Sequence, residues 1–195
     1  MGLDICFSRV NKIDYSLKKE TAINDRIEIG YFYKVNCLLP HFGYVNNVNN
    51  CDYLEIEKMQ IEDLLIKTKE LLAIYGKFHA QLELYKSDLK SYERSLRLST
   101  ALFTIKDNED KCKLIQQKID NLWEPFETAA KEKLPTTLDF FTGGVNGEDY
   151  LEWSFGSQDY RDWYLKGLIE IVEIFEKILD ETDFDIEQVL MWCSW

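Results

Sequence analysis

Residues able to do acid–base or nucleophilic chemistry are few in this chain. His41 and His79 are its only histidines, and we interpret each as a structural or surface residue. Asp159 and Asp162 lie three residues apart on one face of a predicted helix, as an acid pair for hydrolysis might. Two acids in a first helical turn also suit the positive end of the helix dipole, which is the explanation we favour. The sequence therefore predicts no catalytic residues.

Glycines offer a second kind of chemistry, because backbone amides at a helix start can hold an anion. The segments TGG at 142–144 and FGS at 155–157 have this form. Neither matches the glycine patterns of nucleotide-binding proteins, and the acidic residues around them would repel phosphate. We interpret both segments as turns.

Cysteine usage indicates thiols rather than a metal site. The five cysteines are an odd number and contain no CxxC pair, which is best explained by reduced thiols in a cytosolic protein. They are Cys6, Cys37, Cys51, Cys112 and Cys193. No metal and no cofactor are predicted.

Aromatic residues gather in the last third of the chain. They could pack in the core, or they could line a groove that anchors a partner, because Trp and Tyr contribute most per residue at binding surfaces. In the second case Lys34 and Asn36, which follow a predicted strand, would edge the groove. The candidate binding groove comprises Lys34, Asn36, Phe140, Phe141, Trp153, Tyr160 and Trp163.

The charge of the chain is strongly negative. Its 195 residues include 23 Lys plus Arg against 35 Asp plus Glu, and the net charge of −12 disfavours binding to nucleic acid, whose phosphates need cationic contacts. Residues 147–188 hold thirteen acidic and three basic residues. This acidic stretch is either a solvated face or a surface that competes for basic sites on nucleic-acid-binding proteins.

Membrane and export signals are not found in the sequence. No apolar run approaches the roughly 20 residues that span a bilayer. The N-terminus lacks the basic and apolar regions of a signal peptide. We expect a cytoplasmic protein that does not contact membranes.

One amphipathic helix is predicted to organise the fold. Between residues 155 and 179, apolar residues recur every three or four positions, which is the signature of a helix face pressed on a core. Ser157 is the expected N-cap, and Gly167 inside the helix indicates that another backbone segment crosses close to it. The apolar stripe comprises Tyr160, Trp163, Tyr164, Leu168, Ile171, Val172, Phe175, Ile178 and Leu179.

Shorter elements are predicted on either side of this helix. Alternating or compact apolar runs predict extended segments, and Tyr150 and Trp153 are also expected on a strand. A short helix should start near Asn36, and a longer helix should end at Gly76. The polar stretch 11–26 is interpreted as a loop with one short helical turn. The predicted extended segments are 3–8, 27–31, 53–56 and 189–195, and the strands at the two chain ends are expected to be the outer strands of the sheet.

A heptad pattern occupies residues 78–133. Apolar residues step by four and three from Phe78 to Phe103 and again from Cys112 to Ala129, with a break at 106–108. Each half would be roughly 35–40 Å long as a helix. Pro125 should kink the second helix or mark a join. We interpret the pattern as an antiparallel, coiled-coil-like α-hairpin arm; alternatively, both helices lie on the main core.

These elements predict an α+β fold. A small, mainly antiparallel sheet packed by amphipathic helices would form a single body from residues 1–76 and 134–195. The helical hairpin, residues 77–133, would be inserted into this body.

Five short motifs occur in a fixed order along the chain. They are MGLDI at 1–5, IGYFYKVN at 29–36, LPTTLDFFTGG at 134–144, FGSQDYRDWYLKGL at 155–168 and CSW at 193–195. In these motifs the chain resembles a family of phage and prophage proteins with no established activity. The family's histidine and the Trp that follows it fall on Leu39 and His41 here, so a role resting on that histidine would be lost or moved. The resemblance implies an origin in a mobile element, and the hairpin would be an insertion relative to shorter members.

Two functional hypotheses follow from the sequence. The first is a non-enzymatic interaction or regulatory protein of phage or mobile-element origin, which binds a protein partner through its acidic face, its helical arm or both. The alternative is a small-molecule-binding protein, or an unrecognised hydrolase, with an aromatic-lined pocket. A homodimer formed through the arm is a further alternative.

Overall fold

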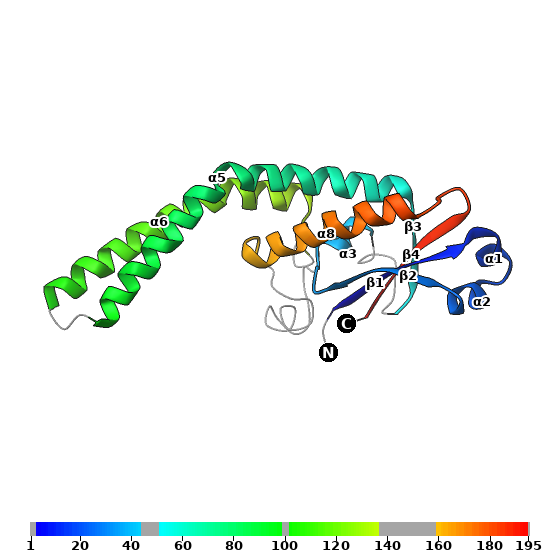
Figure 1. Ribbon diagram of the computed structural model, residues 1–195, viewed down its shortest axis with the longest axis horizontal. Coiled ribbons are helices and arrows are strands. Elements are labelled where there is room, and N and C mark those ends of the chain that lie inside the picture. Colours follow the sequence, from blue (N-terminus) through cyan, green and yellow to red (C-terminus); the bar gives the residue numbers. More distant parts are fainter. Residues whose placement is uncertain (1–2, 44–50, 99–101, 137–158, 195) are drawn as a thin grey trace. The chain divides into compact units, whose positions relative to one another are not determined.

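The computed structural model describes residues 3–43, 51–98, 102–136 and 159–194 of the chain. The chain divides into two compact units (Figure 1). Residues 1–70 and 131–195 form the first, which we call the sheet unit, and residues 71–130 form the second, which we call the hairpin unit. The predicted strand around Tyr150 and Trp153 lies outside the described residues. The fold is α+β, as the sequence predicts.

The sheet unit contains four antiparallel strands in the order β2-β1-β4-β3. The predicted extended segments correspond to these strands, but the expectation that the strands near the chain ends are outermost is wrong. β1 and β4 lie in the middle and pair from Asp4 opposite Ser194 to Asn11 opposite Glu187. Val189, Leu190 and Met191 of β4 are all fully buried, so this inner strand is covered on both of its faces. The strands are β1 (Asp4–Asn11), β2 (Ile27–Tyr33), β3 (Tyr53–Ile56) and β4 (Glu187–Ser194).

Helix α8 (Asp162–Glu181) packs on this sheet through the predicted apolar stripe. Phe175 is fully buried, and its ring contacts Phe7 of β1 at 4.8 Å and Phe32 of β2 at 5.5 Å between centroids. Phe42 completes the cluster, 5.9 Å from Phe175. Such edge and stacked ring pairs stabilise a core by about 0.5–1.5 kcal/mol beyond area burial. The cluster therefore joins α8 to the two strands that it covers.

The start of α8 differs from the prediction. The helix begins at Asp162 and not near residue 155, and its N-cap residue is Arg161, which makes no side-chain capping bond. The expected cap, Ser157, lies outside the described residues. Tyr160 therefore precedes the helix, although its side chain is buried as the predicted stripe requires.

Among the described residues, three short helices flank the strands. Asn11 caps the first of them by accepting the backbone N–H of Ile13 at 2.9 Å. The prediction of a loop with one helical turn over 11–26 is wrong, because two helices occupy it. The short helix expected after Asn36 is confirmed. These helices are α1 (Lys12–Leu17), α2 (Lys19–Asn24) and α3 (Leu38–His41).

Two long helices, α5 (Lys58–Leu98) and α6 (Leu102–Lys133), supply the hairpin unit. They run antiparallel there, because Tyr75 stacks on Trp123 while Lys118 lies over Tyr85 and Lys111 over Tyr92. The predicted stop at Gly76 is wrong, since α5 continues through it. An exposed glycine costs a helix only about 1 kcal/mol, which adjoining turns can offset.

Helix α6 also continues where an interruption was predicted. Residues 106–108 are helical, and Asn108 of this polar stretch is buried. Pro125 lies inside the helix and does not mark a join. Trp123, which the heptad assignment passed over for Leu122, is only 1% exposed and contacts Phe78 and Phe126.

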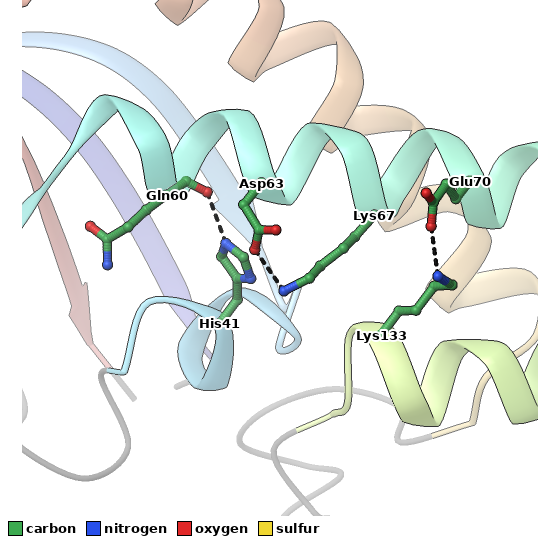
Figure 2. A network of polar contacts seen from close by, with 6 residues as sticks. All are labelled: His41, Gln60, Asp63, Lys67, Glu70 and Lys133. Atoms are coloured by element: carbon green, nitrogen blue, oxygen red, sulfur yellow. Dashed lines mark hydrogen bonds and ion pairs between the residues drawn. The ribbon is translucent and has the colours of Figure 1, made fainter.

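Polar contacts join α3 to the first turns of α5 (Figure 2). His41 Nε2 donates to the backbone carbonyl of Gln60 at 3.0 Å. The Gln60 side chain accepts the backbone N–H of Glu57 at 2.9 Å, which caps the start of α5. Burial lowers the pKa of His41, so the neutral imidazole is favoured here. His41 is thus a structural residue, as the sequence analysis expects.

Two glycine substitutions test the packing of α8. A Cβ at Gly30 of β2 would lie 2.7 Å from Ile174 Cγ2 of α8, whereas nothing lies within 4 Å of a Cβ at Gly76. Gly30→Ala should lower the free energy of unfolding by about 1 kcal/mol through overpacking. Gly76→Ala, the matched control, should raise it by up to about 1 kcal/mol. Urea denaturation measures both, and a stabilising Gly30→Ala would contradict the close packing.

Stability below neutral pH should depend on His41. Because its pKa is lowered on folding, the unfolded chain takes up the proton more readily. The His41 contribution is complete above the ordinary pKa of 6.5 and is lost as the pH falls below it. The free energy of unfolding should therefore decline less between about pH 7.5 and 5.5 in His41→Gln than in the natural chain. His79→Gln is the control, and an unchanged slope in His41→Gln would refute the assignment.

Candidate functional site

A pocket of about 380 Å³ opens in the sheet unit between the end of β2 and the first turns of α8. We call it the α8 pocket. Helix α8 contributes Trp163, Lys166, Gly167 and Glu170, which follow the spacing of one helix face. This face of α8 adjoins the buried stripe. When the stripe packs on the sheet, the face therefore lies beside residues 34–37, which follow β2. The pocket is lined by Tyr33, Lys34, Val35, Asn36, Cys37, Trp163, Tyr164, Lys166, Gly167 and Glu170.

The backbone turns sharply where β2 leads into the pocket. Lys34 has a φ of 58°, a left-handed conformation that is uncommon for residues other than glycine. Its N–H donates to the carbonyl of Leu3 at 2.9 Å, which fixes the turn against the start of β1. This turn places Lys34, Val35 and Asn36 opposite α8.

Close packing at Gly167 brings the two walls together. A Cβ there would lie 3.1 Å from Val35 Cγ1, tighter than ordinary van der Waals contact. The sequence analysis expects another backbone segment close to Gly167, whereas the structure places the side chain of Val35 there. The absence of a side chain at Gly167 therefore lets α8 approach Val35. The longer side chains of Trp163, Lys166 and Glu170 line the pocket around this contact.

Two exposed aromatic rings at the pocket each have a lysine ammonium group over the ring face. Tyr33 is 56% exposed and Lys34 Nζ lies 5.4 Å from its ring centroid. Trp163 is 71% exposed and Lys166 Nζ lies 5.5 Å from its ring. Cations at these distances interact favourably with the faces of the rings. The prediction that Trp163 belongs to the buried stripe is therefore wrong. Its side chain is exposed and lines the pocket.

The deeper wall of the pocket is firmly held. Tyr164 donates its hydroxyl to the buried carbonyl of Leu134 at 2.6 Å, and its ring contacts Tyr160 at 4.9 Å. Asn36 and Cys37 are buried. Burial raises the pKa of the Cys37 thiol to about 12, so it stays protonated at neutral pH and is a poor nucleophile.

The structure brings together part of the predicted groove. Lys34, Asn36 and Trp163 all line the α8 pocket. Tyr160 lies behind it, buried, with its hydroxyl accepting the backbone N–H of Thr136 at 2.7 Å. Phe140, Phe141 and Trp153 lie outside the described residues.

Other lining residues were missed by the sequence analysis. Tyr33 occurs in the sequence analysis only within the motif at 29–36, and Lys166 and Glu170 only within the acidic stretch 147–188. The signal that could have found them is a second helical periodicity, through Trp163, Lys166 and Glu170, offset from the buried stripe.

The acidic stretch forms surface ion pairs on α8. Glu176 pairs with Lys69 at 2.7 Å, Glu170 with Lys166 at 3.8 Å and Glu181 with Lys177 at 3.8 Å. Exposed pairs of this kind stabilise a fold by at most about 1 kcal/mol each. These lysines offset part of the negative charge of the acidic face.

Within the described ranges, no group of three or more His, Cys, Asp or Glu residues could hold a metal ion. The described helices also include none with the length and apolar character that crossing a bilayer requires.

The tyrosine at the back of the pocket provides a stability test. Tyr164→Phe removes the donor to Leu134 and leaves a buried carbonyl without this bond, so the free energy of unfolding should fall by about 1–3 kcal/mol. Tyr33→Phe, which alters an exposed ring in the same pocket, should change it by less than about 0.5 kcal/mol. Equal effects in urea denaturation would contradict this account of the wall.

No protein-family model, curated protein or solved structure matches the chain. The resemblance to phage and prophage proteins therefore stays a prediction based on five motifs.

Proposed function

We propose that this chain is a non-enzymatic binding protein that takes a ring-containing small molecule in the α8 pocket. The observation that carries the proposal is that two strongly exposed rings, Tyr33 and Trp163, line one pocket of about 380 Å³. This volume lies within the range of pockets that enclose small ligands. Large exposed aromatic side chains at a concave site gain most when a flat ligand covers them.

The surroundings of the pocket also favour binding. Its back wall is held by the hydrogen bond from Tyr164 to Leu134, and its floor by the contact between Gly167 and Val35. A pocket whose walls are fixed before binding loses less conformational entropy when a ligand enters. The buried, protonated thiol of Cys37 adds a weakly polar surface without reactivity.

Fragment binding tests the proposal. Saturation-transfer NMR with a set of uncharged, anionic and cationic monocyclic and bicyclic aromatic fragments should find compounds that bind the natural chain. Trp163→Ala should abolish this binding because it removes the most exposed ring. Ile169→Ala is the matched control, since Ile169 is an exposed apolar residue of α8 outside the pocket lining. Absence of any hit, or hits unchanged by Trp163→Ala, would refute the proposal.

A second candidate function is binding of a protein partner through the hairpin unit. It is favoured by Leu84, Leu98 and Leu114, three leucines of this unit that are each more than half exposed. Exposed leucines on a helical surface are common features of partner-binding sites. An origin in a phage or prophage, which the motif resemblance favours, and a regulatory role both belong to this candidate.

Light scattering and capture experiments test the second candidate. If the leucines join two copies of this chain, size-exclusion chromatography with light scattering should give a dimer that the triple substitution to Gln converts to a monomer. If they bind another protein, the natural chain should stay monomeric and capture a bacterial protein that the triple variant does not. A monomer with no leucine-dependent partner would contradict this function.

A further inference from the structure

A run of cations follows one face of α5 within the hairpin unit. Lys90, Arg94 and Arg97 recur at steps of four and three residues, so they lie on the same face of the helix, and all three are exposed. We call these residues the α5 stripe. At a rise of 1.5 Å per residue the stripe is about 10 Å long. The hairpin unit holds nine basic and nine acidic residues, so the net charge of −12 belongs to the rest of the chain.

Like charges adjoin one another in the α5 stripe, and this arrangement costs helix stability. Elsewhere in α5 a lysine has an acid four residues away, as in the ion pair of Lys67 with Asp63 at 2.6 Å. Lys90 instead has Arg94 four residues later, and Arg94 has Arg97 three residues later. Like charges at these spacings destabilise a helix by about as much as opposite charges stabilise it. The stability of α5 therefore does not explain the stripe.

The nearest carboxylate along the helix does not neutralise the stripe. Glu93 lies three residues after Lys90 and four before Arg97, yet within the described part of the chain no ion pair joins it to either. Burial and, to a lesser extent, the Glu93 carboxylate raise the pKa of the Cys112 thiol, so Glu93 lies toward α6. None of the three cations makes an ion pair with a described residue, which leaves them available to a partner.

The size and surroundings of the stripe favour a protein over other polyanions. A membrane site of basic residues usually takes about four to eight of them, and three phosphate contacts give nucleic acid little affinity. Arginine pairs with carboxylates through two parallel hydrogen bonds. Leu98, four residues after Arg94 on the same side of α5, is strongly exposed. A partner for this surface therefore needs carboxylates beside an apolar side chain.

We propose that the α5 stripe binds an acidic amphipathic helix of a partner protein. Carboxylates of that helix, at the same steps of four and three residues, pair with Lys90, Arg94 and Arg97, and an apolar side chain packs on Leu98. This inference rests on the second candidate function, the binding of a protein partner through the hairpin unit, and adds the charge and form of the partner segment. Because salt screens exposed charges, this binding weakens as the ionic strength rises.

The test uses three synthetic helical peptides as probes. The first carries Glu at steps of four and three residues with Leu beside them, the second has Lys in place of every Glu, and the third has Gln in place of every Leu. Fluorescence anisotropy of the labelled peptides gives their dissociation constants. A single-stranded thymidine oligonucleotide and phosphatidylserine vesicles are the probes for the two other classes of polyanion.

The Glu–Leu peptide should bind the natural chain more tightly than any other probe. The triple variant Lys90→Gln, Arg94→Gln and Arg97→Gln should weaken this binding by about thirtyfold, equivalent to about 2 kcal/mol, through the loss of three exposed ion pairs. The same variant should unfold at no lower temperature than the natural chain, because it removes contacts between like charges.

A second triple variant is the matched control. Lys18→Gln, Lys58→Gln and Lys177→Gln remove the same charge from exposed positions of the sheet unit, so they should leave binding of the Glu–Leu peptide nearly unchanged. This control separates a local effect of the stripe from an effect of the overall charge.

Four results would overturn the inference. If the Lys–Leu peptide binds as tightly, or the control variant weakens binding as much as the stripe variant, the charge preference is wrong. If the stripe variant unfolds at a lower temperature, its cations stabilise α5. If the oligonucleotide or the vesicles bind the stripe more tightly than the Glu–Leu peptide, the partner class is wrong. If no peptide binds, the inference fails, and the capture experiment with the leucine variant decides the second candidate separately.

Discussion

The contact between α8 and the inner strand β1 is the constraint on which the sheet unit depends. Phe175 lies against Phe7 and Phe32, and the absent side chain at Gly30 lets α8 approach β2 within contact distance. This packing fixes the rotation of α8 about its own axis. It therefore also decides which face of the helix lies next to the buried face. The α8 pocket lies on that neighbouring face, so the packing of the core determines where the pocket-lining residues of α8 lie.

The sequence predicts the strands and the buried part of α8 well, since alternation and a three-to-four spacing report directly on which side chains face the core. It fails at Trp163 for a physical reason. Trp163 lies within α8 but one residue before Tyr164, and a step of one residue turns a side chain by about 100° around the helix axis. A ring placed one residue before the buried Tyr164 points to the pocket and not to the sheet. Three of the predicted groove residues still meet there because strand end and helix start are adjacent in space.

Local composition misleads in the long helices. Gly76 and the polar residues 106–108 are typical of turns, yet both lie within helices. Gly76 is exposed with open space around it, so it costs α5 only its weak helix propensity. Asn108 is buried in the hairpin unit, which no property of the single residue indicates. Contacts between two helices, such as Tyr75 with Trp123, outweigh these preferences, and they cannot be read from one helix alone.

The central position of β1 and β4 has a consequence for synthesis on the ribosome. Asp4 pairs with Ser194, so the inner edge of β1 stays open until nearly all the intervening chain has been translated. Only β2 can join β1 early, and a two-stranded ribbon is marginally stable in water. The hairpin unit is defined by contacts within residues 71–130, so its two helices can pair before β4 is translated. During translation we therefore expect the hairpin unit to form before the sheet is complete. Until β4 is translated, the open edge of β1 is the part of the chain that a chaperone would have to cover.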